Sequence, residues 1–143
     1  MTTERLHVGL IGVGRIGKVH AEHLFRCIPR ACLKAISDVN TDEARAFGES
    51  IGINRIEADR RALLNDPEID AVVICSPTDM HAVMMEEAAE AGKHIFCEKP
   101  IARTLKEIDK AVNAVEQAGV KLQIGFNRRF DANFARVRQA IAS

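Results

Sequence analysis

The sequence predicts an α/β fold, a doubly wound parallel sheet of the Rossmann type, and three observations lead to it. Short runs rich in Val and Ile alternate with helical segments along the chain, which is typical of βαβ units. The run at 71–75 (AVVIC) is apolar throughout, as in strands buried on both faces of a sheet. A glycine-rich turn at 12–17 (GVGRIG) joins the first strand to the first helix. Right-handed crossovers between such units predict the strand order 3-2-1-4-5-6.

The bounds of the elements follow from the spacing of apolar residues and from the turns between them. The expected strands are 6–11, 32–37, 53–56, 71–75, 94–97 and 121–125. The expected helices are 16–27, 41–50, 60–64, 80–91, 105–118 and a last one after residue 131.

Several residues should begin or end these helices. Thr41 is expected to cap the second helix, and Thr104 with Glu107 predicts a capping box before the fifth. Helix C-caps are expected at Gly92 and Gly119. Asp131 should cap the last helix, with three apolar residues on one face: Phe134, Val137 and Ile141. One apolar side is likewise expected on the first helix, made of Ile16, Val19, Leu24 and Cys27.

Composition excludes several classes of protein. The 143 residues suit one domain, residues 1–143, and 20 basic residues balance 20 acidic ones, so no nucleic-acid partner is expected. No apolar run approaches the ~18 residues of a membrane span, and no signal peptide is seen, so no membrane partner is expected. The four cysteines form no C-x-x-C pair. The sequence therefore predicts a cytoplasmic protein with reduced thiols and no metal site.

The turn at 12–17 has the G-x-G-x-x-G spacing of a dinucleotide-binding loop. Gly12 would permit the tight turn, Gly14 would let the backbone approach a pyrophosphate, and Gly17 would let the helix pack closely on the strand. Arg15 and Ile16 would then supply N–H groups at the helix N-terminus, where anions bind. The plainer alternative is an ordinary strand-to-helix turn.

Asp38 comes 21 residues after Gly17, at the end of the second strand. An acidic residue about ~20 residues beyond the loop binds the ribose hydroxyls in this type of fold. Its carboxylate would repel a 2′-phosphate, and neither Val39 nor Asn40 offers a positive charge. The expected cofactor is therefore NAD rather than NADP. The alternative for Asp38 is a solvated carboxylate at a strand end.

Two polar turns stiffened by proline follow the fourth and fifth strands. The first is Ser76-Pro77-Thr78-Asp79-Met80-His81, and the second is Glu98-Lys99-Pro100. Ligands of open parallel sheets bind outside the carboxyl ends of the strands, so both turns should face the nicotinamide half of a dinucleotide. Lys99 is the natural catalytic group, since a lysine beside a cofactor can hydrogen-bond a substrate oxygen or shuttle a proton.

These motifs together resemble the glucose–fructose oxidoreductase and inositol dehydrogenase superfamily of nicotinamide-dependent sugar dehydrogenases. The resemblance covers the whole chain as the N-terminal domain of such a protein. Four stretches carry it: GVGRIG at 12–17, SPTDMH at 76–81, AGKHIFCEKP at 91–100 and GFNRRFD at 125–131. The last is most similar to inositol 2-dehydrogenases. Ser76 and Thr78 depart from the Thr and Asn usual in the family.

The resemblance implies roles for residues of this chain. Lys99 would contact the substrate hydroxyl that is oxidised, and Glu98 would lie beside the cofactor ribose. The nicotinamide side would be lined by Ser76, Pro77 and His81. The mouth of the substrate pocket would be formed by Asn127 and Arg128.

The resemblance also implies a second domain, which closes the substrate pocket and supplies the proton-accepting base. We expect this chain to lack it, as an engineered fragment, a degradation product or a gene remnant. The full-length parent would be a homo-oligomer, and the fragment would self-associate through apolar surface around Phe126, Phe130 and Phe134.

The predicted function is that of the NAD-binding domain of an oxidoreductase. Hydride would pass between a CH–OH group of a polyol or sugar, myo-inositol-like, and nicotinamide, and this chain alone would be inactive. The alternatives are a non-catalytic dinucleotide-binding module, a gene remnant, or a methyltransferase, which the Glu-Lys-Pro element disfavours. Three smaller questions stay open. Cys75 and Cys97 are either packed core residues or a redox-active pair. Arg128 and Arg129 form either an anion-binding site or an ion pair with Asp131. His20 and His23 are three residues apart on one helix, which is a poor spacing for binding a metal ion.

Overall fold

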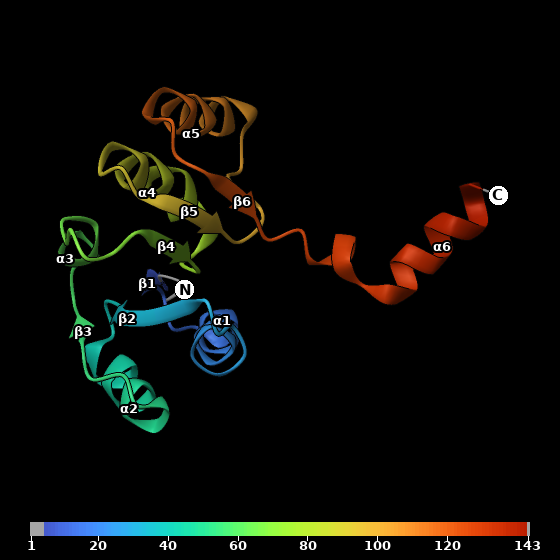
Figure 1. Cartoon of the computed structure of the whole chain (residues 1–143). Helices are drawn as coiled ribbons and strands as arrows, with labels where there is room; N and C mark the ends of the chain where they lie inside the picture. Colours follow the sequence, from blue (N-terminus) through green and yellow to red (C-terminus); the bar gives the residue numbers. More distant parts are fainter. Residues whose placement is uncertain (1–4, 143) are drawn as a thin grey trace.

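The structure is a computed structural model that describes residues 5–142. Six parallel strands form one sheet in the order β3-β2-β1-β4-β5-β6 (Figure 1). Their bounds are β1 Leu6–Ile11, β2 Ala31–Ser37, β3 Ile56–Glu57, β4 Ala71–Ile74, β5 His94–Cys97 and β6 Leu122–Ile124. The predicted Rossmann fold and strand order are thereby confirmed.

Helices cover both faces of the sheet. Those on one side are α1 Arg15–Arg26 and α2 Thr41–Ile51, and those on the other include α4 Thr78–Glu90 and α5 Leu105–Ala118 (Figure 1). Shorter or peripheral helices are α3 Arg61–Leu64, the 3-10 helix η1 Asn127–Phe130 and α6 Ala132–Ala142. Among the described residues, no helix is long and apolar enough to cross a membrane.

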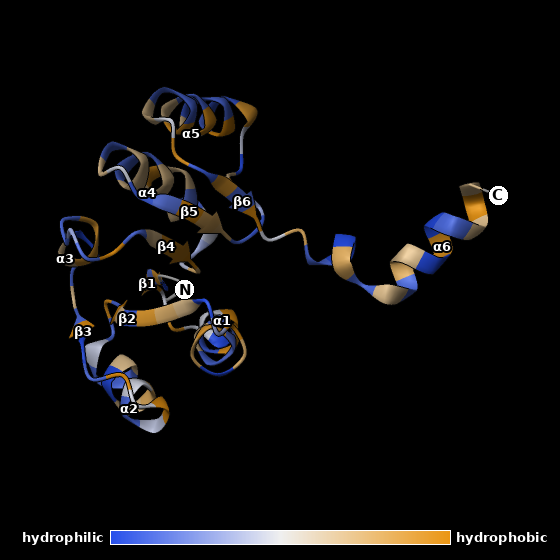
Figure 2. Cartoon of the chain, in the orientation of Figure 1, coloured by the Kyte–Doolittle hydropathy of each residue, from blue (hydrophilic) through white to orange (hydrophobic). Residues whose placement is uncertain are grey.

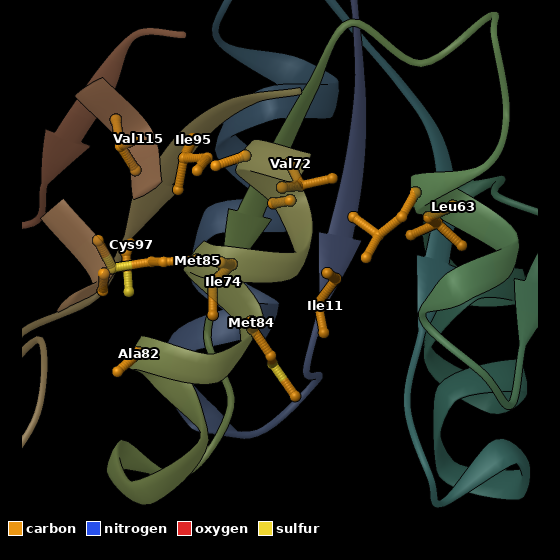
Figure 3. Close-up of a cluster of buried hydrophobic side chains, with 14 of the residues drawn as sticks. Ile11, Leu63, Val72, Ile74, Ala82, Met84, Met85, Ile95, Cys97 and Val115 are labelled. Carbon is orange, nitrogen blue, oxygen red and sulfur yellow. The ribbon is translucent and has the colours of Figure 1, made fainter. Parts of the chain in front are cut away.

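The two helical layers enclose two hydrophobic clusters, one on each face of the sheet. The first joins β4 and β5 to α4 and α5, with Met85 and Cys97 fully buried in it (Figure 3). The second joins β1 and β2 to α1 and α2 around Leu10 and Ile36. Every residue of β4 is buried, as its unbroken apolar run predicts. This strand therefore fixes the centre of the sheet, with the functional turns at its carboxyl end.

The predicted ends of α5 are confirmed, and two other predicted caps are displaced by one residue. Thr104 and Glu107 form the capping box of α5, and Gly119 is its C-cap with a φ of 67°. The C-cap of α4 is Ala91 rather than Gly92, which follows it with a φ of 71°. The N-cap of α2 is Asn40 rather than Thr41, because the Asn40 Oδ1 accepts a hydrogen bond from the Glu43 N–H. Asn is as effective an N-cap as Ser or Thr, and here it lies one residue earlier.

Two elements begin two or more residues from the predicted position, and the other boundaries differ by at most one residue. β3 comprises Ile56–Glu57 instead of 53–56, because the Ile53 N–H is bonded to the Gly48 carbonyl and completes the end of α2. α4 begins at Thr78, two residues before the predicted start. Pro77 occupies its N-cap, where the fixed φ of proline is tolerated and its carbonyl accepts the first helical bond, from Met80.

The predicted apolar side of α1 is wrong for three of its four residues, and only Leu24 packs, partly buried, against the cluster around Leu10 and Ile36. Ile16 and Val19 are 43% and 41% exposed, and Cys27 is exposed as well. The helix instead turns Gly17 and Ala21 toward the sheet. A Cβ atom on Gly17 would lie 2.0 Å from the Gly12 carbonyl oxygen, so only glycine fits at this contact.

α6 leaves the sheet edge and extends away from the rest of the domain (Figure 1). Asp131 caps it as predicted, since its Oδ1 accepts hydrogen bonds from the N–H groups of Asn133 and Phe134. None of residues 132–142 is buried, and Val137 and Ile141 are 57% and 81% exposed. Figure 2 shows hydrophobic and hydrophilic residues mixed along this helix. The expected apolar face is thus largely exposed, and the Arg128 guanidinium lies over the ring of Phe134.

Candidate cofactor-binding site

The glycine-rich turn at the end of β1 is built on two close backbone contacts. Gly12 has a φ of 97°, and a Cβ on it would lie 2.8 Å from the carbonyl oxygen of Cys75. Gly17 packs against the carbonyl of Gly12 itself. Glycine is therefore required at both positions, for the left-handed backbone conformation at Gly12 and for close approach at both. These contacts hold the start of α1 against the carboxyl ends of β1 and β4.

The N-terminus of α1 is open. Gly14 is its N-cap, and a Cβ built there would meet no described atom within 4 Å. Arg15 and Ile16, the first two helical residues, are both exposed. Their backbone N–H groups have no intrahelical acceptor, because the first turn of any helix leaves such donors free. The end of the helix can thus receive an anionic group that comes close to the backbone.

Asp38 follows β2 directly and reaches across to the glycine-rich turn. Its Oδ2 accepts a 2.7 Å hydrogen bond from the Val13 N–H, and its Oδ1 accepts one of 2.8 Å from Asn40. Each carboxylate oxygen has a further lone pair, so the group can still accept bonds from a ligand's hydroxyls. Asp38 is therefore a fixed, half-buried anion beside the loop and not a strand-end carboxylate surrounded by water.

A pocket of about 280 Å³ lies between the glycine-rich turn, Asp38 and the Ser76-Pro77 turn. Its lining is Ile11, Gly12, Ser37, Asp38, Val39, Ala58, Arg60, Ser76, Pro77, Met80 and Met84. Its lining is mostly apolar and includes the charged side chains of Asp38 and Arg60. The pocket joins residues that the sequence singled out on three separate turns.

Arg60 is a lining residue that the sequence analysis missed. Its guanidinium makes two hydrogen bonds to Glu87 of α4, Nε to Oε2 at 2.6 Å and Nη2 to Oε1 at 2.8 Å. The bond to Glu87 raises the pKa of Arg60 above its ordinary value. Such a bidentate pair fixes the plane of the guanidinium. No local pattern marks this residue, because its partner lies 27 positions away.

His81 connects the two proline-stiffened turns. It is 2% exposed, with Nδ1 lying 2.7 Å from the carbonyl oxygen of Pro100 and Nε2 lying 2.8 Å from that of Ser76. Both neighbours are carbonyl oxygens, which accept hydrogen bonds. The turn after β4 and the turn after β5 are therefore tied together through one buried side chain.

The Glu98-Lys99 turn lies next to this tie. The Glu98 N–H donates to the Ile74 carbonyl, and the Glu98 carboxylate accepts bonds from the His20 ring and from the Lys99 N–H. Lys99 itself is exposed. The structure thus brings Glu98, Lys99 and His81 to one edge of the sheet, with the lysine side chain accessible from outside.

The buried cysteines at this edge behave as core residues. Burial raises the pKa of Cys75 to about 12 and that of Cys97 to about 12. Because the thiolate is the reactive form of cysteine, a thiol held protonated is a poor redox partner. This favours the core-packing interpretation over a redox pair. Among the described residues, no group of three His, Cys, Asp or Glu side chains could hold a metal ion.

Asn127 and Arg128 lie outside the pocket. Both are exposed residues of η1, beyond the carboxyl end of β6. The Arg128 Nη1 lies 3.6 Å from Asp131 Oδ2, and its guanidinium lies 4.8 Å from the centre of the Phe134 ring. Of the two interpretations of Arg128, the structure contains the surface ion pair.

Comparison with known proteins agrees with this geometry. A family model described as "Oxidoreductase family, NAD-binding Rossmann fold" (GFO_IDH_MocA) matches residues 6–126. A myo-inositol 2-dehydrogenase of Thermotoga maritima is 43% identical over 136 residues, which are 95% of this chain and 40% of that protein. A scyllo-inositol 2-dehydrogenase (NAD(+)) of Bacillus subtilis is 38% identical over 137 residues, 96% of this chain and 40% of that protein.

A solved structure agrees as well. The scyllo-inositol dehydrogenase of Lactobacillus casei, with bound NAD(H) and scyllo-inositol, superposes with a TM-score of 0.90 at 33% identity. The match covers 97% of this chain and 41% of that one. The chain thus spans about 40% of the length of these relatives. Because the matching family is one of oxidoreductases, the alternative of a methyltransferase is not supported. The chain belongs to the GFO_IDH_MocA family of oxidoreductases, with an NAD-binding Rossmann fold over residues 6–126.

Proposed function

We propose that residues 1–143 are the dinucleotide-binding domain of an enzyme that moves a hydride between a CH–OH group of a polyol or sugar and the nicotinamide of NAD. The observation that carries the proposal is the placement of Asp38. Its carboxylate is held at 2.7 Å from the Val13 N–H and lines the pocket beside Gly12. A fixed anion at this point accepts ribose hydroxyls and repels a 2′-phosphate.

The residues around the pocket would hold the cofactor along the carboxyl edge of the sheet. The pyrophosphate would lie at the N-terminus of α1, near Gly14, Arg15 and Ile16, and the adenosine half would enter the pocket beside Asp38 and Arg60. The nicotinamide half would lie against the turns of Ser76, Pro77, His81 and Glu98. The bound cofactor supplies the hydride-accepting ring, while these residues only bind and orient it.

Lys99 would act on the substrate. Its exposed ammonium can donate a hydrogen bond to the substrate hydroxyl and favour the negative charge that develops on that oxygen. Asn127 and Arg128 would contribute to the mouth of the substrate pocket. A myo-inositol-like polyol is the proposed substrate, supported by relatives that are inositol dehydrogenases. The parent protein would work in the cytoplasm as a homo-oligomer.

A second candidate is a dinucleotide-binding module without turnover. This candidate is favoured because the titratable side chains at this edge of the sheet already make hydrogen bonds within the protein. Both His81 nitrogens face carbonyl oxygens, and the Glu98 carboxylate is bonded to His20 and Lys99. These groups already make hydrogen bonds within the protein, and the lysine of the Glu98-Lys99 turn is exposed.

Titration calorimetry with NAD and NADP tests the role of Asp38. NAD should bind more tightly than NADP. Asp38→Ala should lower the affinity for NAD about tenfold or more, which corresponds to the loss of a hydrogen bond to a charged group. Asp38→Asn is the matched control, because it removes the charge and keeps one acceptor oxygen. It should narrow the difference between NAD and NADP while leaving the fold intact. Equal affinities of the wild-type chain for the two cofactors would contradict the proposal.

A further inference from the structure

We propose that His20 is a positioning residue that holds the Glu98 carboxylate, and with it the Glu98-Lys99 turn, in place for the nicotinamide half of the cofactor. The inference rests on the proposed function and adds to it a residue on a different element. His20 lies on α1, three residues beyond the glycine-rich turn, and Glu98 follows β5. The two are 78 positions apart in the sequence.

The contact itself is short and mostly shielded from water. The His20 Nε2 lies 2.8 Å from the Glu98 Oε1, and the two side chains are 24% and 12% exposed. An ionised carboxylate only accepts hydrogen bonds, so the hydrogen of this bond is on Nε2 of the imidazole. Bonds to a charged acceptor in such partly buried surroundings are stronger than neutral ones.

The imidazole ring is itself held by a second contact. The ring of Phe96, on β5, meets that of His20 edge to face, with centroids 5.1 Å apart and an interplanar angle of 61°. Aromatic pairs favour this arrangement. The ring of His20 is thus oriented from the same strand that leads into Glu98, which makes its hydrogen bond specific in direction.

The other side of the carboxylate is enclosed by the end of β6. A Cβ on Gly125 would lie 3.0 Å from Glu98 Oε1 and 3.2 Å from Oε2, so any larger residue there would push the carboxylate. The Lys99 N–H donates to Oε2 at 3.2 Å. Three separate segments therefore define one position for Glu98: α1, the turn after β5 and the residue after β6.

This arrangement connects the two halves of the proposed cofactor site through one helix. The N-terminus of α1 faces the pyrophosphate position, and His20, farther along the same helix, holds the turn proposed to face nicotinamide. Loss of the His20 bond should therefore weaken contacts to the nicotinamide end and spare those to ADP-ribose. If His20 only stabilised the fold, its substitution would lower the affinity for both ligands to the same extent.

The experiment compares NADH with ADP-ribose by titration calorimetry on the 143-residue chain. His20→Leu should weaken the binding of NADH about tenfold, because a hydrogen bond to a charged group is lost. The affinity for ADP-ribose should change by less than about twofold. His20→Gln, which keeps a donor N–H₂, should recover most of the NADH affinity. His23→Leu is the matched control, as the same change at an exposed position three residues along α1, and should bind both ligands as the wild type does.

A second variant approaches the same carboxylate from β6. Gly125→Ala should show the same selective loss for NADH, and the double variant with His20→Leu should lose less than the sum of the two effects, because both act through Glu98. Thermal unfolding of each variant identifies any that fails to fold, and the other variant then decides.

The possible results separate this inference from the proposed function. A wild-type chain that binds neither NADH nor ADP-ribose would overturn the proposed function. A wild-type chain that binds both, together with His20→Leu and Gly125→Ala variants that bind NADH normally, would overturn only the role of His20. Equal weakening of both ligands would show that His20 supports the fold alone.

Discussion

Single residues at the carboxyl edge of the sheet differ sharply in their environment, and cysteine reactivity makes this measurable. Burial raises the pKa of both Cys75 and Cys97 to about 12, whereas Cys27 is exposed. A raised pKa means that the thiol stays protonated, so at pH 8 iodoacetamide should modify Cys27 readily and Cys75 and Cys97 only after unfolding. Mass spectrometry of the alkylated native chain measures this. Cys27→Ser is the control, and rapid alkylation of Cys97 in the folded chain would contradict the prediction.

The residues that sequence reasoning found at this scale are those with local signals. A fixed spacing that the backbone requires links Gly12, Gly17 and Asp38. In the structure all three belong to or contact the glycine-rich turn at 12–17. His20 and Arg60 were missed because their importance depends on partners far along the chain, Glu98 and Glu87. A bond between residues 78 positions apart leaves no trace in spacing or composition.

Elements were predictable to different degrees for physical reasons. The central strand was predictable because β4 is buried on both faces and must be continuously apolar. The orientation of α1 was not, because apolar periodicity assumes that the largest apolar side chains face the core. Here the close approach of the helix to the Gly12 carbonyl selects Gly17 and Ala21 instead. A contact between backbones thus outweighed the burial of Ile16 and Val19.

The same helix supplies a matched pair of variants. Gly17→Ala would place a Cβ 2.0 Å from the Gly12 oxygen, and should destabilise the domain by about 3 kcal/mol and abolish cofactor binding. Gly14→Ala meets no described atom within 4 Å, so the free energy of unfolding should stay near that of the wild type while NAD binding weakens. Urea denaturation and calorimetry measure both quantities. A Gly14→Ala chain that binds NAD normally would show that the pyrophosphate does not approach this backbone.

At the scale of the whole molecule, three aromatic residues beyond β6 are exposed. Phe126, Phe130 and Phe134 are 58%, 78% and 50% exposed, which agrees with the expected exposure of this region. Self-association through them remains a prediction. α6 was predictable as an amphipathic helix, but its position away from the sheet was not, because periodicity defines a face without specifying what packs against it.

The catalytic capacity of the 143-residue chain depends on how its polar groups are placed. Hydride transfer requires the carbinol carbon to be held ~3–3.5 Å from the acceptor carbon, and that positioning supplies several kcal/mol of the barrier reduction. Lys99, Asn127 and Arg128 are all exposed, so no substrate is enclosed by them. An exposed lysine ammonium has donors and no acceptor, which makes Lys99 alone a poor base.

We therefore expect this chain to bind NAD and to show no turnover. The groups proposed to bind NAD, Asp38 and the N-terminus of α1, are in place among the described residues, whereas the Glu98 carboxylate and both His81 nitrogens already make hydrogen bonds within the protein. The test supplies NAD with myo-inositol, scyllo-inositol or glucose and follows the absorbance of reduced nicotinamide, while calorimetry on the same sample confirms that NAD is bound. Sustained turnover that disappears in Lys99→Met would contradict this expectation, because it would show that residues 1–143 hold both the positioning groups and the base.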